Sequence, residues 1–135
     1  TDVVVAKMPF GIIGLMVCYD LRFPELALTL RARGANILTA PAAFTYTTGQ
    51  MHWQLLLQAR AMDSQCQVLG AAQQGWHGEK RQTWGHAAAT NSRGQVLDLI
   101  LNPGAQLITV PFDLAEQVQI RESMPLMQHR KLIQL

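Results

Sequence analysis

The sequence lacks any run of like charge, any long apolar run, and all but two cysteines. Its 11 basic and 9 acidic residues give a formal net charge of +2 over 135 residues. Without a basic cluster, binding to the phosphate backbone of nucleic acid is not expected. No apolar stretch reaches the roughly 18 residues of a membrane span, and Thr1 to Lys7 lacks the features of a signal peptide. We therefore expect a cytoplasmic protein with no nucleic-acid and no membrane partner.

Cysteine is too scarce for a disulfide scaffold of the secreted type, since only Cys18 and Cys66 are present. Neither cysteine forms a CxxC pattern, and His52 and His86 do not have the spacing of metal ligands. We expect no metal site. Cys66 follows a predicted helix without a charged neighbour and is expected to be an inert, packed thiol.

The residues that are present, 49% of them hydrophobic and 15% charged, suffice for one globular core. Strands alternate with helices in the first half and form hairpins in the second, which predicts an α/β (α+β) domain of packed layers. Apolar runs and turn residues predict strands at 3–6, 12–17, 35–40, 67–73, 85–90, 95–101 and 105–112, helices at 24–33, 51–64 and 113–122, and a polar loop at 75–83.

Local signals support several of these elements. Pro24 suits the first turn of its helix, and Gly34 follows the end of that helix. The strand at 12–17 is apolar on both faces, so it is expected to be buried. Asp113 and Glu116 have the spacing of a reciprocal capping box.

Cys18 stands at the carboxyl end of a predicted buried strand, directly before a turn into a helix. In α/β folds this edge of the sheet carries the reactive groups. The amides and partial positive charge of a helix start can stabilise a thiolate and lower the thiol pKa below about 8.5. The same turn would direct the Tyr19 amide to the position of an oxyanion. The alternative is a packed, unreactive cysteine, because free cysteine is among the most buried residue types.

The residues around Cys18 resemble the nucleophile segment of the nitrilase superfamily of carbon–nitrogen hydrolases. Gly14–Glu25 holds the cysteine, tyrosine, acidic residue, arginine and aromatic–Pro–Glu group of that pattern in order. The likeness extends from Phe10 onward and is closest to the Nit-type amidases, which hydrolyse deaminated glutathione or ω-amides. Further matching segments are Pro41–Phe44, Thr48–Gly49, His52–Trp53, Arg60–Ala61, Gly85–His86, Arg93–Gly94, Met124–Pro125 and His129–Lys131.

The resemblance implies a four-layer α-β-β-α sandwich, with residues 1–135 as the C-terminal portion of one domain. It implies an amidase that forms an acyl-thioester on cysteine, expels ammonia or an amine, and releases the acid by hydrolysis. The substrate would be a small amide, and no cofactor is implied. By this resemblance the nucleophile is Cys18, the substrate contacts are Tyr19, Arg22, Phe44 and Thr45, and the structural residues of the motif are Asp20 and Glu25.

Arg22 matches an arginine that neutralises a substrate carboxylate in several members of the family, which suits a bidentate guanidinium contact. The alternative is a structural ion pair with Asp20 or Glu25. Both remain open from the sequence.

The resembled family also uses a glutamate base and a lysine before the cysteine. No glutamate precedes Cys18, and Lys7 is expected to be an exposed residue that discourages pairing at a strand edge. His52 and His86 are expected to pack rather than to act as the base. We therefore expect a truncated chain, a fragment or one piece of a split protein, with little amidase activity alone.

Such a chain would leave apolar surface and strand edges open. We expect it to form a homo-oligomer or to pair with a complementing N-terminal segment, and residues 132–135 could extend a contact between copies. The alternative to an amidase is a non-catalytic folded module that associates with itself.

Overall fold

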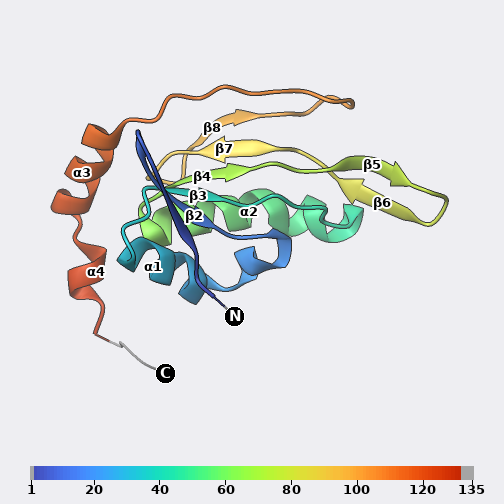
Figure 1. The fold of residues 1–135 in the computed structure, drawn as a ribbon. Helices are drawn as coiled ribbons and strands as arrows, with labels where there is room; N and C mark the ends of the chain where they lie inside the picture. The colour runs from blue at the N-terminus through green and yellow to red at the C-terminus, as the bar shows by residue number, and fades with distance from the viewer. Residues whose placement is uncertain (1, 132–135) are drawn as a thin grey trace.

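The computed structural model describes residues 2–131, so the expected contact through residues 132–135 lies outside the described part. These residues form a six-stranded sheet with helices on one face and a separate two-stranded hairpin (Figure 1). The elements are β1 (Val5–Met8), β2 (Gly11–Leu15), the 3-10 helix η1 (Cys18–Arg22), α1 (Pro24–Ala32), β3 (Ile37–Thr39), α2 (Tyr46–Ser64), β4 (Gln67–Gly70), β5 (Gln74–His77), β6 (Arg81–Trp84), β7 (Ala88–Thr90), β8 (Val96–Leu99), α3 (Leu114–Ser123) and α4 (Leu126–His129).

The centre of the large sheet is parallel, and its order is β1-β2-β3-β4-β7-β8. Strands β2, β3 and β4 run parallel, whereas β1, β7 and β8 pair antiparallel with their neighbours. Because the carboxyl ends of adjacent parallel strands meet at one edge, the segments that follow β2, β3 and β4 converge there. The predicted α/β layering is confirmed, and this edge holds the candidate site.

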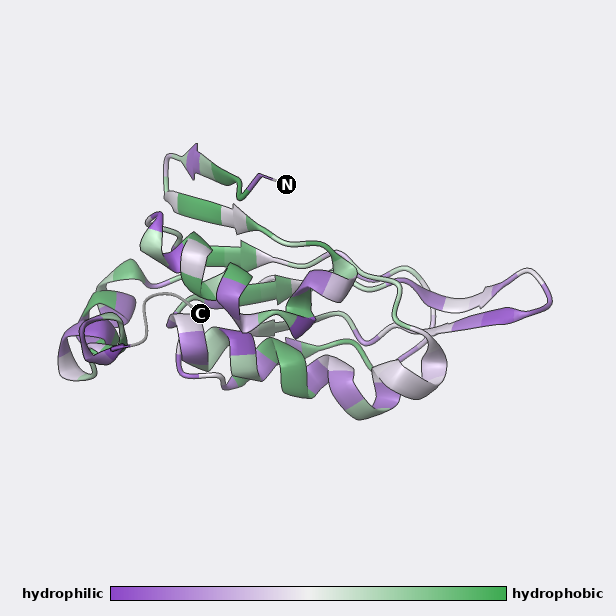
Figure 2. Ribbon diagram, turned by 90° about the horizontal axis from the view of Figure 1, so that it is seen from below, coloured by the Kyte–Doolittle hydropathy of each residue, from purple (hydrophilic) through white to green (hydrophobic). Residues whose placement is uncertain are grey.

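Helices α1 and α2 cover one face of the sheet (Figure 2). Trp53 and Leu57 of α2 are buried against the sheet, and the Trp53 indole donates to the carbonyl of His86 at 2.6 Å. Gly70 allows this close packing, since a Cβ there would lie 2.7 Å from the Trp53 ring. The core therefore lies between the two helices and the strands.

The opposite face of the sheet carries no helix from residues 2–131. The extended chain after β8 crosses it (Figure 1), and between the two lies a mostly apolar hollow of about 630 Å³. Strand β2 was predicted to be buried on both faces, but only Gly14 of its residues is buried and Leu15 is 45% exposed. That prediction is wrong because the described residues cover only one side of the strand.

Three other expectations need correction. Residues 75–83 do not form a loop, because they lie in the β5–β6 hairpin that projects from the sheet (Figure 1). Residues 105–112 form no strand, since no described strand pairs with them. The capping box is only half formed: the Asp113 carboxylate accepts from the Glu116 amide at 2.9 Å, while the Glu116 carboxylate lies 3.6 Å from Arg93.

A buried polar network joins α3 to the sheet. Gln117 accepts from the Asn36 side-chain amide at 3.1 Å, and it donates to the Asn36 carbonyl and to the Ser92 hydroxyl, both at 2.8 Å. The Asn36 side-chain oxygen accepts from the Ile12 amide at 3.0 Å. This helix is therefore attached through satisfied hydrogen bonds, which buried polar groups require.

Candidate functional site

Cys18 is the first residue of η1, beyond the end of β2, and its backbone has a conformation that residues other than glycine rarely adopt. Its φ is 48°, in the left-handed region that disfavours residues other than glycine. The Cys18 amide donates to the Pro41 carbonyl at 2.8 Å, and the Met16 amide donates to the Thr39 carbonyl at 3.0 Å. Strained residues held by such contacts are concentrated at functional sites. The turn thus holds a half-buried thiol at the sheet edge.

The amides of this turn divide into bonded and unbonded groups. The Asp20 carboxylate accepts from the Val17 amide at 2.8 Å, and the Asp20 amide donates to the Val17 carbonyl at 3.0 Å. Within residues 2–131, no acceptor is bonded to the Tyr19 amide. The first amides of a helix lack partners within the helix, so the Tyr19 amide can donate a hydrogen bond to a negatively charged oxygen beside Cys18.

A hollow of about 560 Å³ opens at Cys18. Its walls come from the segments after the three parallel strands, and the Ala42–Ala72 bridge joins two of them. None of the described residues that line it is charged. They are Val17, Cys18, Pro41, Ala42, Ala43, Ala71, Ala72 and Gln73.

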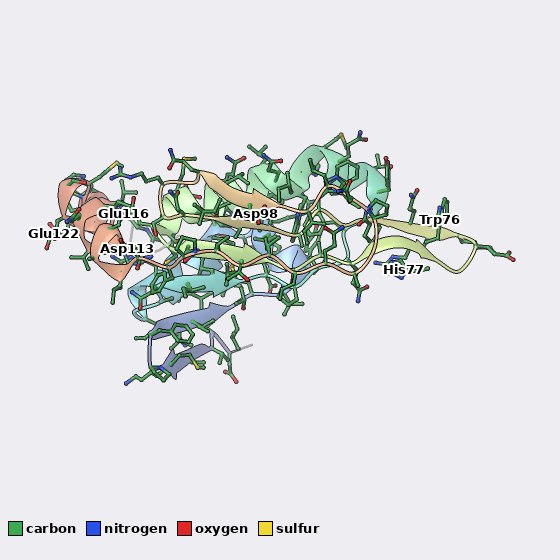
Figure 3. The ribbon with its side chains drawn as sticks, turned by 90° about the horizontal axis from the view of Figure 1, so that it is seen from above. Trp76, His77, Asp98, Asp113, Glu116 and Glu122 are labelled. Carbon is green, nitrogen blue, oxygen red and sulfur yellow. The ribbon has the colours of Figure 1, made fainter. Side chains whose placement is uncertain are left out.

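A second hollow, of about 500 Å³, adjoins the first and shares Ala71, Ala72 and Gln73 with it. Its own walls include two imidazoles, His77 and His86. Together the two hollows, called the groove below, are lined by residues from Cys18 at one end to His77 of the β5–β6 hairpin at the other, and Figure 3 labels His77. Sequence reasoning missed the wall at 71–73, although the end of a third central strand was a signal for it.

Arg22 lies over two aromatic rings. Its guanidinium carbon is 5.3 Å from the Tyr19 ring centroid and 5.5 Å from that of Phe44, in the range of cation–π contacts. Its Nη2 is 3.3 Å from Nδ1 of His52. The alternative, an ion pair of Arg22 with Asp20 or Glu25, is wrong. The two ion pairs within residues 2–131 are Arg60–Asp63 and Arg93–Glu116.

The remaining predicted site residues, Phe44, Thr45 and Glu25, do not line the hollow at Cys18. Phe44 is buried and packs edge to face on Trp53. Its ring contacts the Arg22 guanidinium, and it lines neither hollow. Thr45 precedes α2, and its hydroxyl lies 2.7 Å from the Thr48 hydroxyl. Glu25 is exposed in the first turn of α1, and its carbonyl accepts from the Thr29 hydroxyl.

The second cysteine, Cys66, is fully buried, which confirms the predicted packing of this thiol. The prediction that it lacks a charged neighbour is wrong. Its sulfur lies 3.2 Å from the Ala35 carbonyl and 3.5 Å from Nη2 of Arg121. Burial is the main cause that raises the pKa of this thiol, outweighing the opposing effect of Arg121. A raised pKa makes the thiolate of Cys66 scarce, so the environment of Cys66 disfavours reaction of this thiol.

Histidines and acidic residues do not form a metal centre in the described part of the chain, where no three or more possible ligands cluster. His86 stacks on Trp84 with ring centroids 3.9 Å apart. Lys7 is exposed on the edge strand β1. No helix of residues 2–131 is long and apolar enough to span a bilayer.

Comparison with known proteins gives concordant matches. The family model described as carbon-nitrogen hydrolase matches residues 1–122. A deaminated glutathione amidase of Yersinia enterocolitica is 46% identical over 130 residues, which are 96% of this chain and 45% of that protein. A nitrilase and fragile histidine triad fusion protein of Drosophila melanogaster is 48% identical over 123 residues, 91% of this chain and 27% of the fusion.

Among solved structures, the NitFhit protein of C. elegans superposes with a TM-score of 0.88 at 40% identity. The superposition covers 97% of this chain and 32% of that one. The chain thus spans less than half the length of these three relatives.

Proposed function

The chain belongs to the carbon–nitrogen hydrolase family, and from that premise we propose that Cys18 is the nucleophile of an amidase that cleaves a small linear amide. The observation that carries the proposal is the left-handed Cys18 turn, which opens into a hollow beside the unbonded Tyr19 amide. The small lining residues leave room for a carbonyl group beside the sulfur.

In the proposed reaction, the Cys18 thiolate attacks the amide carbonyl carbon and a C–S bond forms. The carbonyl oxygen becomes negatively charged and accepts a hydrogen bond from the Tyr19 amide. As the tetrahedral intermediate collapses, the C–N bond breaks and the nitrogen leaves as ammonia or an amine after taking a proton. Water then attacks the thioester, which releases the acid and returns the thiol.

Proton transfer needs a general base, and the described walls of the Cys18 hollow contain no carboxylate and no amine. We propose that a glutamate and a lysine from outside residues 2–131 complete the site. Residues 1–135 would then be the C-terminal portion of a single domain, with little activity when isolated. The chain's share of its relatives' length, 45% of the Yersinia protein, supports this proposal.

The substrate class follows from Arg22 and from the relatives. The Arg22 guanidinium is oriented by two aromatic rings and forms no ion pair within residues 2–131, so it can bind a substrate carboxylate. Relatives named deaminated glutathione amidase support an amide of that kind, and a short ω-amide has the same chemistry.

The test measures ammonia release from a short ω-amide by two proteins: the isolated 135-residue chain, and the same chain supplied with the N-terminal portion of a relative. We expect release only from the completed protein, and its loss in Cys18→Ser but not in Cys66→Ser. Release by the isolated chain would refute the incomplete site. Release by completed Cys18→Ser would refute the nucleophile.

We also propose that the protein associates with itself. Support comes from Met51, Leu55 and Met62, which are exposed on one side of α2 at helical spacing. Sedimentation of the parent chain and of Leu55→Glu tests this. A monomeric parent would contradict the association, and an unchanged oligomer in Leu55→Glu would contradict the use of this surface. The two free thiols suit the reducing cytoplasm, where we place the protein.

A further inference from the structure

The β5–β6 hairpin lies against the groove and has no part in the proposed chemical steps. The Trp84 amide donates to the Phe44 carbonyl at 3.0 Å. Nη2 of Arg81 donates to the Ala43 carbonyl at 3.1 Å, and Ala43 lines the hollow at Cys18. Strand β6 is therefore attached at two places to the segment after β3, and one of them, Ala43, belongs to the wall of the site.

Arg81 and His77 share one face of the hairpin, and His77 lines the second hollow from this face. They are cross-strand partners in the register of β5 and β6, and side chains of directly opposed residues leave a sheet on the same side. His77 lines the second hollow, whereas Trp76 is exposed and, in Figure 3, points to the other side of the hairpin. The contact of Nε2 of His77 with the Thr83 hydroxyl, at 2.8 Å, orients the imidazole.

The charge of Arg81 has no acidic partner in the described part of the chain. Glu79, in the turn of the same hairpin, forms no ion pair with it. No carboxylate of residues 2–131 lines either hollow. The contact with Ala43 uses one of the five guanidinium donors, and the planar fork that remains suits a carboxylate.

We propose that Arg81, with His77 beside it, binds a second carboxylate, separate from the one assigned to Arg22, at the end of the substrate remote from the scissile C–N bond. The inference rests on the proposed function: if Cys18 is the reacting thiol, a group bound at His77 and Arg81 is remote from the scissile bond. Arg81 is then a specificity residue: it favours extended amides with a distal negative charge over neutral amides of equal length.

The test compares alkylation of Cys18 by two maleimides of similar length, ε-maleimidocaproate and neutral N-hexylmaleimide. Peptide-resolved mass spectrometry gives both rate constants in the protein, in Arg81→Gln and in Arg93→Gln. The control, Arg93→Gln, removes the same charge from the β7–β8 turn. Arg93 faces Glu116, which Figure 3 labels at the end of the molecule opposite His77. We expect Arg81→Gln to lower the anionic-to-neutral rate ratio about fivefold and Arg93→Gln to leave it unchanged.

The two proposals fail in different ways. A ratio at Cys18 that is the same in Arg81→Gln as in the parent, while Cys18 still reacts much faster than Cys66, would overturn this inference alone. Cys18 reacting no faster than Cys66 would overturn the proposed function and this inference with it. A fivefold loss that diminishes with added salt supports the inference, because salt screens an exposed charge.

Discussion

Replacing Gln117 by leucine tests whether the buried amide network stabilises the fold. Gln117 is 1% exposed and makes three hydrogen bonds, two with Asn36 and one with Ser92. Leucine is similar in size and cannot replace any of them. At about 1 kcal/mol for each bond, and with the Asn36 amide left without its acceptor, we expect a loss of about 3 kcal/mol in the free energy of unfolding.

Gln119→Leu is the matched control, since Gln119 lies on the same helix and is exposed. Urea unfolding of both variants measures the difference, with the expected shift of the midpoint confined to Gln117→Leu. The surface substitution should remain within about 0.5 kcal/mol of the parent. Equal midpoints for the two variants would refute the claim that these hydrogen bonds attach α3 to the sheet.

Two further predictions concern packing and pH. Gly49→Ala should destabilise the fold by about 2 kcal/mol, because the new Cβ would lie 2.2 Å from the Trp84 Cβ. The control is Gln50→Ala at an exposed position of the same helix, and equal urea midpoints for the two variants would refute the contact. The buried Cys66 keeps its proton above its usual pKa of 9.0, whereas the unfolded chain releases it, so stability should fall by up to about 1.4 kcal/mol per pH unit above about pH 9. Cys66→Ala should reduce that slope, and an unchanged slope in urea titrations across this range would contradict the assignment.

Local signals sufficed to predict the turn that carries Cys18. An apolar strand, Pro24 at the first turn of the helix and Gly34 after its end are all close in sequence, and the structure shows that strand, turn and helix. The order of strands and helices likewise predicted the layers. Propensity and periodicity act over a few residues, so these elements could be found without tertiary information.

Other features depend on partners distant in the chain. Arg121 reaches Cys66 from 55 positions away, so nothing near Cys66 indicates a charged neighbour. The predicted second helix begins at 51, whereas α2 begins at Tyr46, because Gly49 packs on Trp84 in a contact that local propensity does not contain. Among the residues of β5 and β6 only Thr83 is buried, so the sequence of the hairpin shows no apolar alternation.

The most direct test of the account is to find which atom becomes acylated. The protein is incubated with the p-nitrophenyl ester of a short acid, whose leaving group departs without a proton from a general base, and the adduct is located by peptide mass spectrometry. We predict one acyl group on the Cys18 sulfur, absent in Cys18→Ala and unaffected by Cys66→Ala. Acylation at Cys66 instead, or an adduct that persists in Cys18→Ala, would contradict the assignment of Cys18 as the nucleophile.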